Sequence, residues 1–175
     1  GGLGLDYEEN QSPLEIKEFM KILDEIKKRF KLNEIWMELG RFAVGNYGVY
    51  ATKIIDMKRS GNRELIITEG GINHLARRAL TDQSFPASLF RESNQTKQEY
   101  FLHGPLCTSL DKQGSYQLPN DISEDDWMIF HKCGAYGFTE SMPFFLCHNL
   151  PAEIIIKDEN REVMRTIKPA SEWLV

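Results

Sequence analysis

The chain has 175 residues, of which 41% are apolar and 27% charged, enough to bury the core of one domain or one and a half. Its formal net charge of −5, with no block of lysines and arginines, argues against a nucleic-acid or anionic-membrane surface. No apolar run reaches the length of about 18 residues that a spanning helix needs, and no signal peptide is evident. Three cysteines are too few for a disulfide framework or a zinc site. We therefore expect a cytoplasmic protein without a metal.

The chain opens on a glycine-rich run, Gly1-Gly2-Leu3-Gly4. Because glycine has no Cβ, such a run allows a tight turn whose backbone amides approach an anion closely. A phosphate could therefore bind there. A flexible chain end would have the same composition, and this alternative stays open.

Start signals for a helix follow at Ser12, Pro13 and Glu15, which fit an N-cap, a first-turn proline and the glutamate of a capping box. Apolar side chains then recur at steps of three and four residues, the spacing of one face of an amphipathic helix. They are Leu14, Phe19, Ile22, Leu23, Ile26 and Phe30. We expect this face to be exposed in the chain as it stands and to promote self-association.

Residues 35–41 predict a short buried strand that ends in Glu38, Gly40 and Arg41. Active sites of α/β folds collect at such strand ends. The carboxylate and the guanidinium suit a protonated ring nitrogen and an anionic group, respectively. A local ion pair between Glu38 and Arg41 is the alternative.

The rest of the chain is predicted to be mostly β, beyond a boundary near 44–49. A turn at 60–63 between two β-prone runs indicates a hairpin. Residues 70–80 should include a short helix, and 81–98 form a polar excursion. The predicted strands cover 49–55, 64–68, 100–103, 116–118, 127–131, 153–157 and 163–168.

Two loops of the predicted β region carry reactive side chains. In Gly104-Pro105-Leu106-Cys107-Thr108-Ser109-Leu110-Asp111, the Gly-Pro turn can hold Cys107 in one orientation beside a sheet. In Cys133-Gly134-Ala135-Tyr136-Gly137, two glycines flank a phenol that could point at a ligand oxyanion. An ordinary loop and a structural tyrosine are the alternatives.

In their order and spacing, four motifs resemble the C-terminal half of the alanine-racemase-like pyridoxal-phosphate decarboxylases, which include the ornithine, diaminopimelate and arginine decarboxylases. They are Gly1-Gly2-Leu3-Gly4, Glu38-Leu39-Gly40-Arg41, Gly104-Pro105-Leu106-Cys107 and Gly134-Ala135-Tyr136. The resemblance implies a mixed α and β fold, with the terminal βα units of a (β/α)8 barrel in residues 1–46 and a mostly antiparallel C-terminal β domain in 47–175. It also implies a homodimer with shared active sites.

The resemblance assigns one set of residues to the cofactor, pyridoxal 5'-phosphate. The glycine run would hold its phosphate, Glu38 would keep its pyridine nitrogen protonated, and Arg41 would bind the phosphate or a substrate carboxylate. The implied cofactor-binding set is Gly1, Gly2, Gly4, Glu38, Gly40, Arg41 and Tyr136.

A second set is implied for catalysis and substrate binding. Cys107 resembles the cysteine that reaches into the neighbouring subunit's active site, where it could act as a general acid. Arg77 lies in a stretch, 71–80, that resembles a substrate-arginine segment. Thr108 and Asp111 make the loop around the cysteine polar enough to face a substrate.

The chain alone is expected to be an inactive part of a carboxy-lyase. The family's Schiff-base lysine lies in an early barrel strand, no lysine here has that context, and a complete barrel needs about 250 residues. Diaminopimelate decarboxylases usually have a glutamate where this chain has Thr108, which favours the biosynthetic-cluster branch of the family and a small or carrier-tethered aminoacyl substrate. Diaminopimelate remains an alternative, as does a non-catalytic β module that dimerises or docks a partner.

Overall fold

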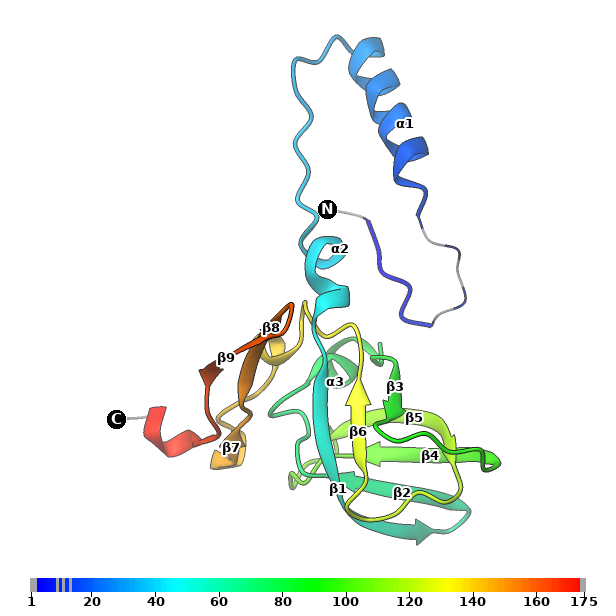
Figure 1. The fold of residues 1–175 in the computed structure, drawn as a ribbon, viewed down its shortest axis with the longest axis vertical. Coiled ribbons are helices and arrows are strands. Elements are labelled where there is room, and N and C mark those ends of the chain that lie inside the picture. Colours follow the sequence, from blue (N-terminus) through cyan, green and yellow to red (C-terminus); the bar gives the residue numbers. More distant parts are fainter. Residues whose placement is uncertain (1–2, 9, 11, 13, 174–175) are drawn as a thin grey trace.

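The computed structural model of the chain describes residues 3–8, 10, 12 and 14–173. The helix α1 spans Ile16–Arg29 and stands away from the sheet, and a long segment without helix or strand leads from its C-terminal end back to α2 (Gly40–Val44; Figure 1). None of its residues is buried, and Ile22 is 54% exposed. This confirms the predicted amphipathic helix and its exposed face. The predicted N-cap is wrong, because the helix begins after Glu15, which makes no side-chain capping bond.

The predicted strand at residues 35–41 is absent. Residues 35–39 form neither a helix nor a strand, they pair with no strand of the described chain, and Trp36 is 88% exposed. A strand needs a neighbour to satisfy its backbone amides and carbonyls, and none lies beside this segment. The chain instead turns into the short helix α2 (Gly40–Val44) and the 3-10 turn η1 (Gly45–Tyr47), which lead into the sheet.

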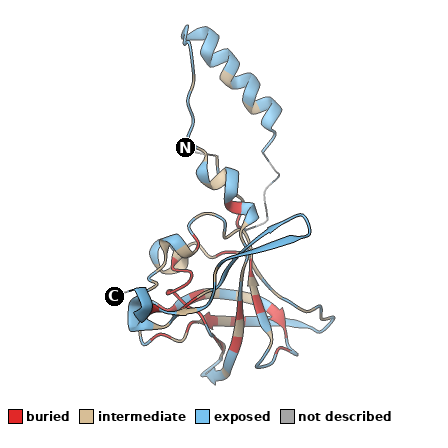
Figure 2. Ribbon diagram, turned by 60° about the vertical axis from the view of Figure 1, so that its left-hand side comes forward, coloured by how far each residue is buried: buried red, intermediate tan, exposed pale blue. Residues whose placement is uncertain are grey.

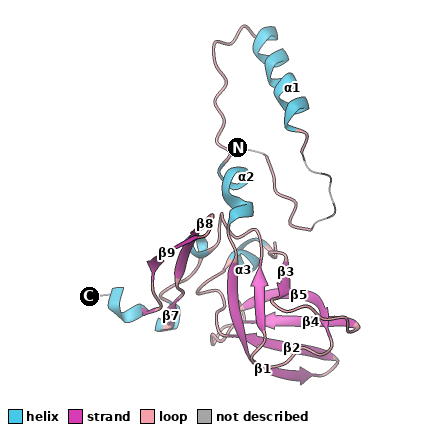
Figure 3. Cartoon of the chain, in the orientation of Figure 1, coloured by secondary structure: helices cyan, strands magenta, loops and turns pink. Residues whose placement is uncertain are grey.

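Six strands form one strongly bent sheet (Figures 1 and 3). Its order is β3-β6-β1-β2-β4-β5, and every neighbouring pair is antiparallel except β2 with β4. The outer strands β3 and β5 also contact each other, so the sheet nearly closes into a barrel. The strands are β1 (Tyr50–Ser60), β2 (Arg63–Thr68), β3 (Ala87–Leu89), β4 (Lys97–His103), β5 (Lys112–Pro119) and β6 (Trp127–Phe130).

Alternating side chains place the core on the inner face of this sheet. Ile54, Ile66, Leu102 and Met128 are fully buried, and Figure 2 shows the buried residues gathered in the sheet while α1 is exposed. The predicted hairpin is confirmed, with Gly61 at a positive φ of 61° in its turn. The later predicted strands match β4 to β6.

A short helix and a C-terminal annex complete the fold. The predicted helix within 70–80 is confirmed as α3 (Arg77–Thr81), whereas β3 inside 81–98 was not predicted, because three residues carry no usable period. The annex contains β7 (Asn149–Leu150) paired with β10 (Lys168–Pro169), and an exposed hairpin of β8 (Glu153–Lys157) and β9 (Asn160–Arg165). Three 3-10 turns lie at Phe138–Glu140, Phe145–Cys147 and Ala170–Trp173.

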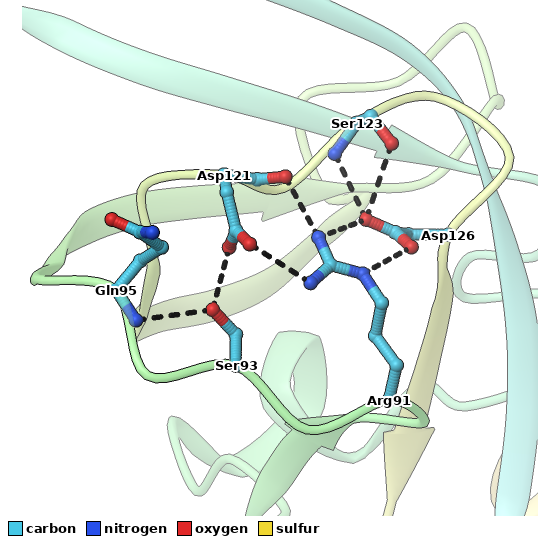
Figure 4. A network of polar contacts seen from close by, with 6 residues as sticks. All are labelled: Arg91, Ser93, Gln95, Asp121, Ser123 and Asp126. Atoms are coloured by element: carbon cyan, nitrogen blue, oxygen red, sulfur yellow. Dashed lines mark hydrogen bonds and ion pairs between the residues drawn. The ribbon is translucent and has the colours of Figure 1, made fainter.

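One arginine ties two loops together at an end of the sheet (Figure 4). Arg91, after β3, donates from Nε and Nη2 to the two carboxylate oxygens of Asp126 at 2.8 and 2.9 Å. It also donates to the side chain of Asp121 at 3.1 Å and to that residue's carbonyl at 2.7 Å. We call this group the Arg91 clamp; it joins the β3–β4 loop to the β5–β6 loop.

Candidate active site

A crossing of two glycines sets the geometry of the site. Gly48, before β1, lies against Gly134, after β6, so closely that a Cβ on either would collide with backbone atoms. The Cys133 amide donates to the Gly48 carbonyl at 2.8 Å, and the Gly134 amide donates to the Gly45 carbonyl at 3.0 Å. This contact holds α2 against the loop that follows β6.

The crossing brings together three residues that the sequence predicted separately. Tyr136 has a positive φ of 56° and a half-exposed ring. The guanidinium of Arg77 lies 4.7 Å from the ring centroid, and that of Arg41 lies 5.8 Å from it. Both distances are within the range of a cation–π contact. We call Arg41, Arg77 and Tyr136 the site cluster.

Two further side chains fix the arginines. Arg77 Nη1 lies 3.0 Å from both carboxylate oxygens of Glu140, and its Nη2 donates to Gln83 Oε1 at 3.3 Å. The same amide oxygen accepts a longer bond, 3.5 Å, from Arg41 Nη1. Sequence reasoning missed Gln83 and Glu140, although Glu140 lies only one turn beyond Tyr136 in the same loop.

The N-terminal segment passes beside the site cluster. Tyr7 is 7% exposed, its ring packs edge-on against Phe85 at 5.7 Å, and the Arg41 guanidinium lies 5.8 Å from its centroid. Burial raises the pKa of Tyr7, and the charge of Arg41 offsets part of that rise. Within the described residues, the buried Tyr7 Oη and Arg77 Nε have no hydrogen-bond partner. The site therefore retains unused donors beside a positive charge.

The glycine run and the expected carboxylate, Glu38, are not part of the site cluster. Gly1 and Gly2 lie outside the described residues, and Gly4 lies in an extended stretch without a turn, where an added Cβ would meet nothing. Gly40 begins α2, and Glu38 is exposed just before it. No ion pair of the described residues joins Glu38 to Arg41, so the local pair considered for them is not formed.

The loop that carries Cys107 is held in place by a buried carboxylate, that of Asp111. Asp111 is 2% exposed, and its carboxylate accepts from the amides of Ile72 at 2.8 Å and Leu106 at 2.7 Å. Burial raises the pKa of Asp111, and these two amides offset part of that rise. The predicted substrate contact of Asp111 is therefore corrected, because both oxygens are already bonded within the fold. Cys107 is exposed on this loop, and Thr108 beside it is partly exposed.

No hydrogen bond, ion pair or ring contact of the described residues joins Cys107 to the site cluster of the same chain, although the neighbouring Leu106 packs with Ala76, next to Arg77. The sequence also did not indicate a polar pair, Tyr50 and His74, on the β1 strand and in the segment after β2. His74 Nδ1 accepts from Tyr50 Oη at 2.6 Å, and its Nε2 donates to the Asn149 carbonyl at 2.8 Å. The described residues include no cluster of three metal-ligating side chains, and each described helix is too short or too polar to span a membrane.

Comparison with known proteins gives matches that cover most of the chain. The family described as pyridoxal-dependent decarboxylase, C-terminal sheet domain, matches residues 17–134. A diaminopimelate decarboxylase of Buchnera aphidicola from Acyrthosiphon pisum is 29% identical over 99% of this chain and 46% of its own length. An L-glutamyl-[BtrI acyl-carrier protein] decarboxylase of Niallia circulans is 25% identical over 94% of this chain and 42% of its own.

Solved structures show the same fold. A crystal structure of diaminopimelate decarboxylase superposes with a TM-score of 0.86 at 22% identity, covering 99% of this chain and 45% of that one. The enzyme from Helicobacter pylori, complexed with L-lysine, gives a TM-score of 0.80 at 22% identity over 98% and 41%. The chain thus spans less than half the length of these relatives.

Proposed function

The chain belongs to the pyridoxal-dependent decarboxylases, as a C-terminal part of their fold, and from this premise we propose that the complete protein decarboxylates an amino acid at the site cluster. The observation that carries the proposal is the placement of Arg41 and Arg77 on the ring of Tyr136. Residues 1–46 would then complete the barrel, and 47–175 would form the β domain beside it.

The residues present fit the family's cofactor, pyridoxal phosphate. A guanidinium with one long contact, a half-exposed phenol and the unpartnered Oη of Tyr7 form a donor set suited to a phosphate. Arg41 and Tyr136 would hold that group, with Gly4 and Gly40 nearby. The exposed Glu38 would keep the pyridine nitrogen protonated.

When bound, pyridoxal phosphate supplies the electron sink that accommodates the charge left by departing carbon dioxide. The residues of this chain position the reactants and move the proton. The cluster orients the phosphate, and the Cys107 thiol donates a proton to the substrate carbon that has lost its carboxylate. Because Cys107 is exposed and makes no hydrogen bond or ion pair with its own cluster among the described residues, and because the family resemblance implies a shared site, we assign it to the cluster of a second copy, in a homodimer with shared active sites.

For the substrate, we propose a small or carrier-tethered aminoacyl group. Thr108, beside Cys107, is neutral and cannot pair with the distal ammonium of free diaminopimelate as a glutamate could. The relative from Niallia circulans is named for a carrier-protein substrate. Diaminopimelate is the second candidate, favoured by the names of the other relatives reported above.

The test uses the full-length natural protein loaded with pyridoxal phosphate. Carbon dioxide release is measured from aminoacyl carrier protein, free ornithine, free arginine and free meso-diaminopimelate. We expect release from the first class, and we expect Thr108→Glu to increase release from diaminopimelate. Rapid turnover of free diaminopimelate by the wild type would reverse the choice of substrate. No release from any of them by a protein that still dimerises would favour a non-catalytic module.

A further inference from the structure

The two guanidiniums of the site cluster differ in how far their charges are neutralised. Arg77 is 13% exposed, and its Nη1 lies 3.0 Å from both oxygens of Glu140, itself 27% exposed. A carboxylate in this position cancels most of the guanidinium charge. Arg41 has no carboxylate partner among the described residues; its Nη1 donates to the neutral Gln83 at 3.5 Å, and its guanidinium lies 5.8 Å from the centroid of the Tyr7 ring.

Arg77 is also fixed in place. Its Nη1 is held by Glu140, its Nη2 by Gln83 at 3.3 Å, and its planar face lies 4.7 Å from the centroid of Tyr136. Turning the guanidinium toward a ligand would break contacts on three sides of a mostly buried side chain. Breaking these contacts costs more free energy than breaking an exposed ion pair.

We propose that Glu140 is a positioning residue that cancels the charge of Arg77 and holds it on the ring of Tyr136, so that Arg41 alone binds the anion of a ligand. This differs from the substrate-binding role predicted for Arg77. The proposal rests on the proposed function only for the identity of the ligand, because anion binding is measured without turnover.

The experiment is a calorimetric titration of inorganic phosphate, at pH 8, into the full-length protein freed of pyridoxal phosphate. We expect Glu140→Gln to bind phosphate about tenfold more tightly than wild type, because the variant leaves Arg77 with an uncompensated charge. A merely structural role for Glu140 would lower the affinity or leave it unchanged. Glu140→Asp keeps the negative charge and should bind phosphate nearly as the wild type does.

Two arginine variants complete the series. Arg41→Gln should weaken phosphate binding about tenfold or more, whereas the double variant Arg77→Gln/Glu140→Gln, which removes both charges of the pair, should change it less than about twofold. Glu153→Gln is the matched control, because Glu153 pairs with an arginine, Arg165, that also stacks on an aromatic ring, outside the site cluster. It should leave phosphate affinity unchanged.

Two results would overturn the proposal: an equal loss of affinity in Arg41→Gln and in the double variant Arg77→Gln/Glu140→Gln, or an unchanged affinity in Glu140→Gln. The first would mean that Arg77 itself contacts the anion, and the second that Glu140 does not control the charge that the anion meets. A protein that binds phosphate as expected but releases no carbon dioxide would refute the proposed function and leave this inference intact.

Discussion

The Arg91 clamp and the site cluster use the same type of side chain for opposite purposes. In the clamp, one guanidinium donates to two carboxylates, those of Asp121 and Asp126, so its charge is neutralised within the clamp (Figure 4). In the site cluster, Arg41 contacts two aromatic rings and one amide oxygen, and its charge has no carboxylate partner among the described residues. We therefore expect the arginine whose charge is neutralised within the fold to contribute to stability, and the arginine whose charge is left open to contribute to ligand binding.

If this contrast is right, substitutions near the site should lower activity and leave stability unchanged. Substitutions in the clamp should lower stability and leave activity unchanged. The largest effect is expected for Cys107→Ala in the full-length enzyme, because a general acid contributes about 10²–10⁴-fold to turnover. Cofactor affinity should stay the same, since the thiol holds no part of the phosphate. Steady-state turnover and cofactor titration would measure the two effects separately.

Mixed dimers provide the control for that variant. Subunits carrying Cys107→Ala, mixed with subunits that lack the Schiff-base lysine, should recover activity, because one of the two shared sites is then complete. If the mixture stays inactive while wild-type subunits exchange normally, the assignment of the cysteine to the partner's site is incorrect.

The next effect in size concerns cofactor affinity. Arg41→Gln should weaken pyridoxal-phosphate binding about 10- to 100-fold, the loss expected for a charge-assisted hydrogen bond to an anion. Arg91→Gln is the control of the same chemistry and should leave this affinity unchanged. Absorbance titration of the full-length protein measures both, and equal losses in the two variants would remove the distinction between clamp and cluster.

A smaller effect is expected for Asp126→Asn, which should lower the thermal midpoint by a few degrees without changing cofactor affinity. The bonds from Arg91 hold the pKa of Asp126 below its ordinary value. This contribution to stability is therefore present above the unfolded pKa, near 3.8, and is lost as the pH falls through the lower folded pKa. The variant should lack that part of the acid dependence, as melting curves from pH 3 to pH 7 would show.

The smallest effect concerns His74. Burial lowers its pKa below the ordinary value of 6.5, so the folded protein binds this proton less readily than the unfolded chain. Stability is then full above about pH 6.5 and declines as the pH falls below that value toward the folded pKa. His74→Gln should flatten this slope, measured by denaturant unfolding between pH 5 and pH 8. An unchanged slope would assign the dependence to another group.

The sequence predicted the sheet well because its strands carry their own periodic signal. Val49 to Ile55 and Glu64 to Thr68 alternate over a hairpin turn, and the pairing follows from that local pattern. The strand expected at 35–41 has the same composition, but it lacks a neighbour in the described chain. A strand's existence depends on a partner that its own residues do not encode.

The sequence nominated some residues of the site cluster and missed their neighbours for one physical reason. Arg41 and Tyr136 belong to motifs, so resemblance nominated them, and the structure places them together. Gln83 and Glu140 belong to no motif and matter only through their contacts with Arg77. Asp111 was assigned to a substrate because its loop is polar, yet that carboxylate turns inward to two backbone amides. Sequence gives the type of side chain, whereas its direction depends on the tertiary fold.

The glycine crossing also bears on the order in which the molecule folds. Gly48 precedes the first strand of the sheet and Gly134 follows the sixth, so their contact joins positions separated by nearly the entire β region. Contacts between such distant positions form late, because closing a long loop costs chain entropy before any bond is gained. We therefore expect Arg41 to stack on Tyr136 late in folding, after the local hairpin of β1 and β2 has formed. A partly folded chain would then have core strands before it had the arrangement that we propose for cofactor binding.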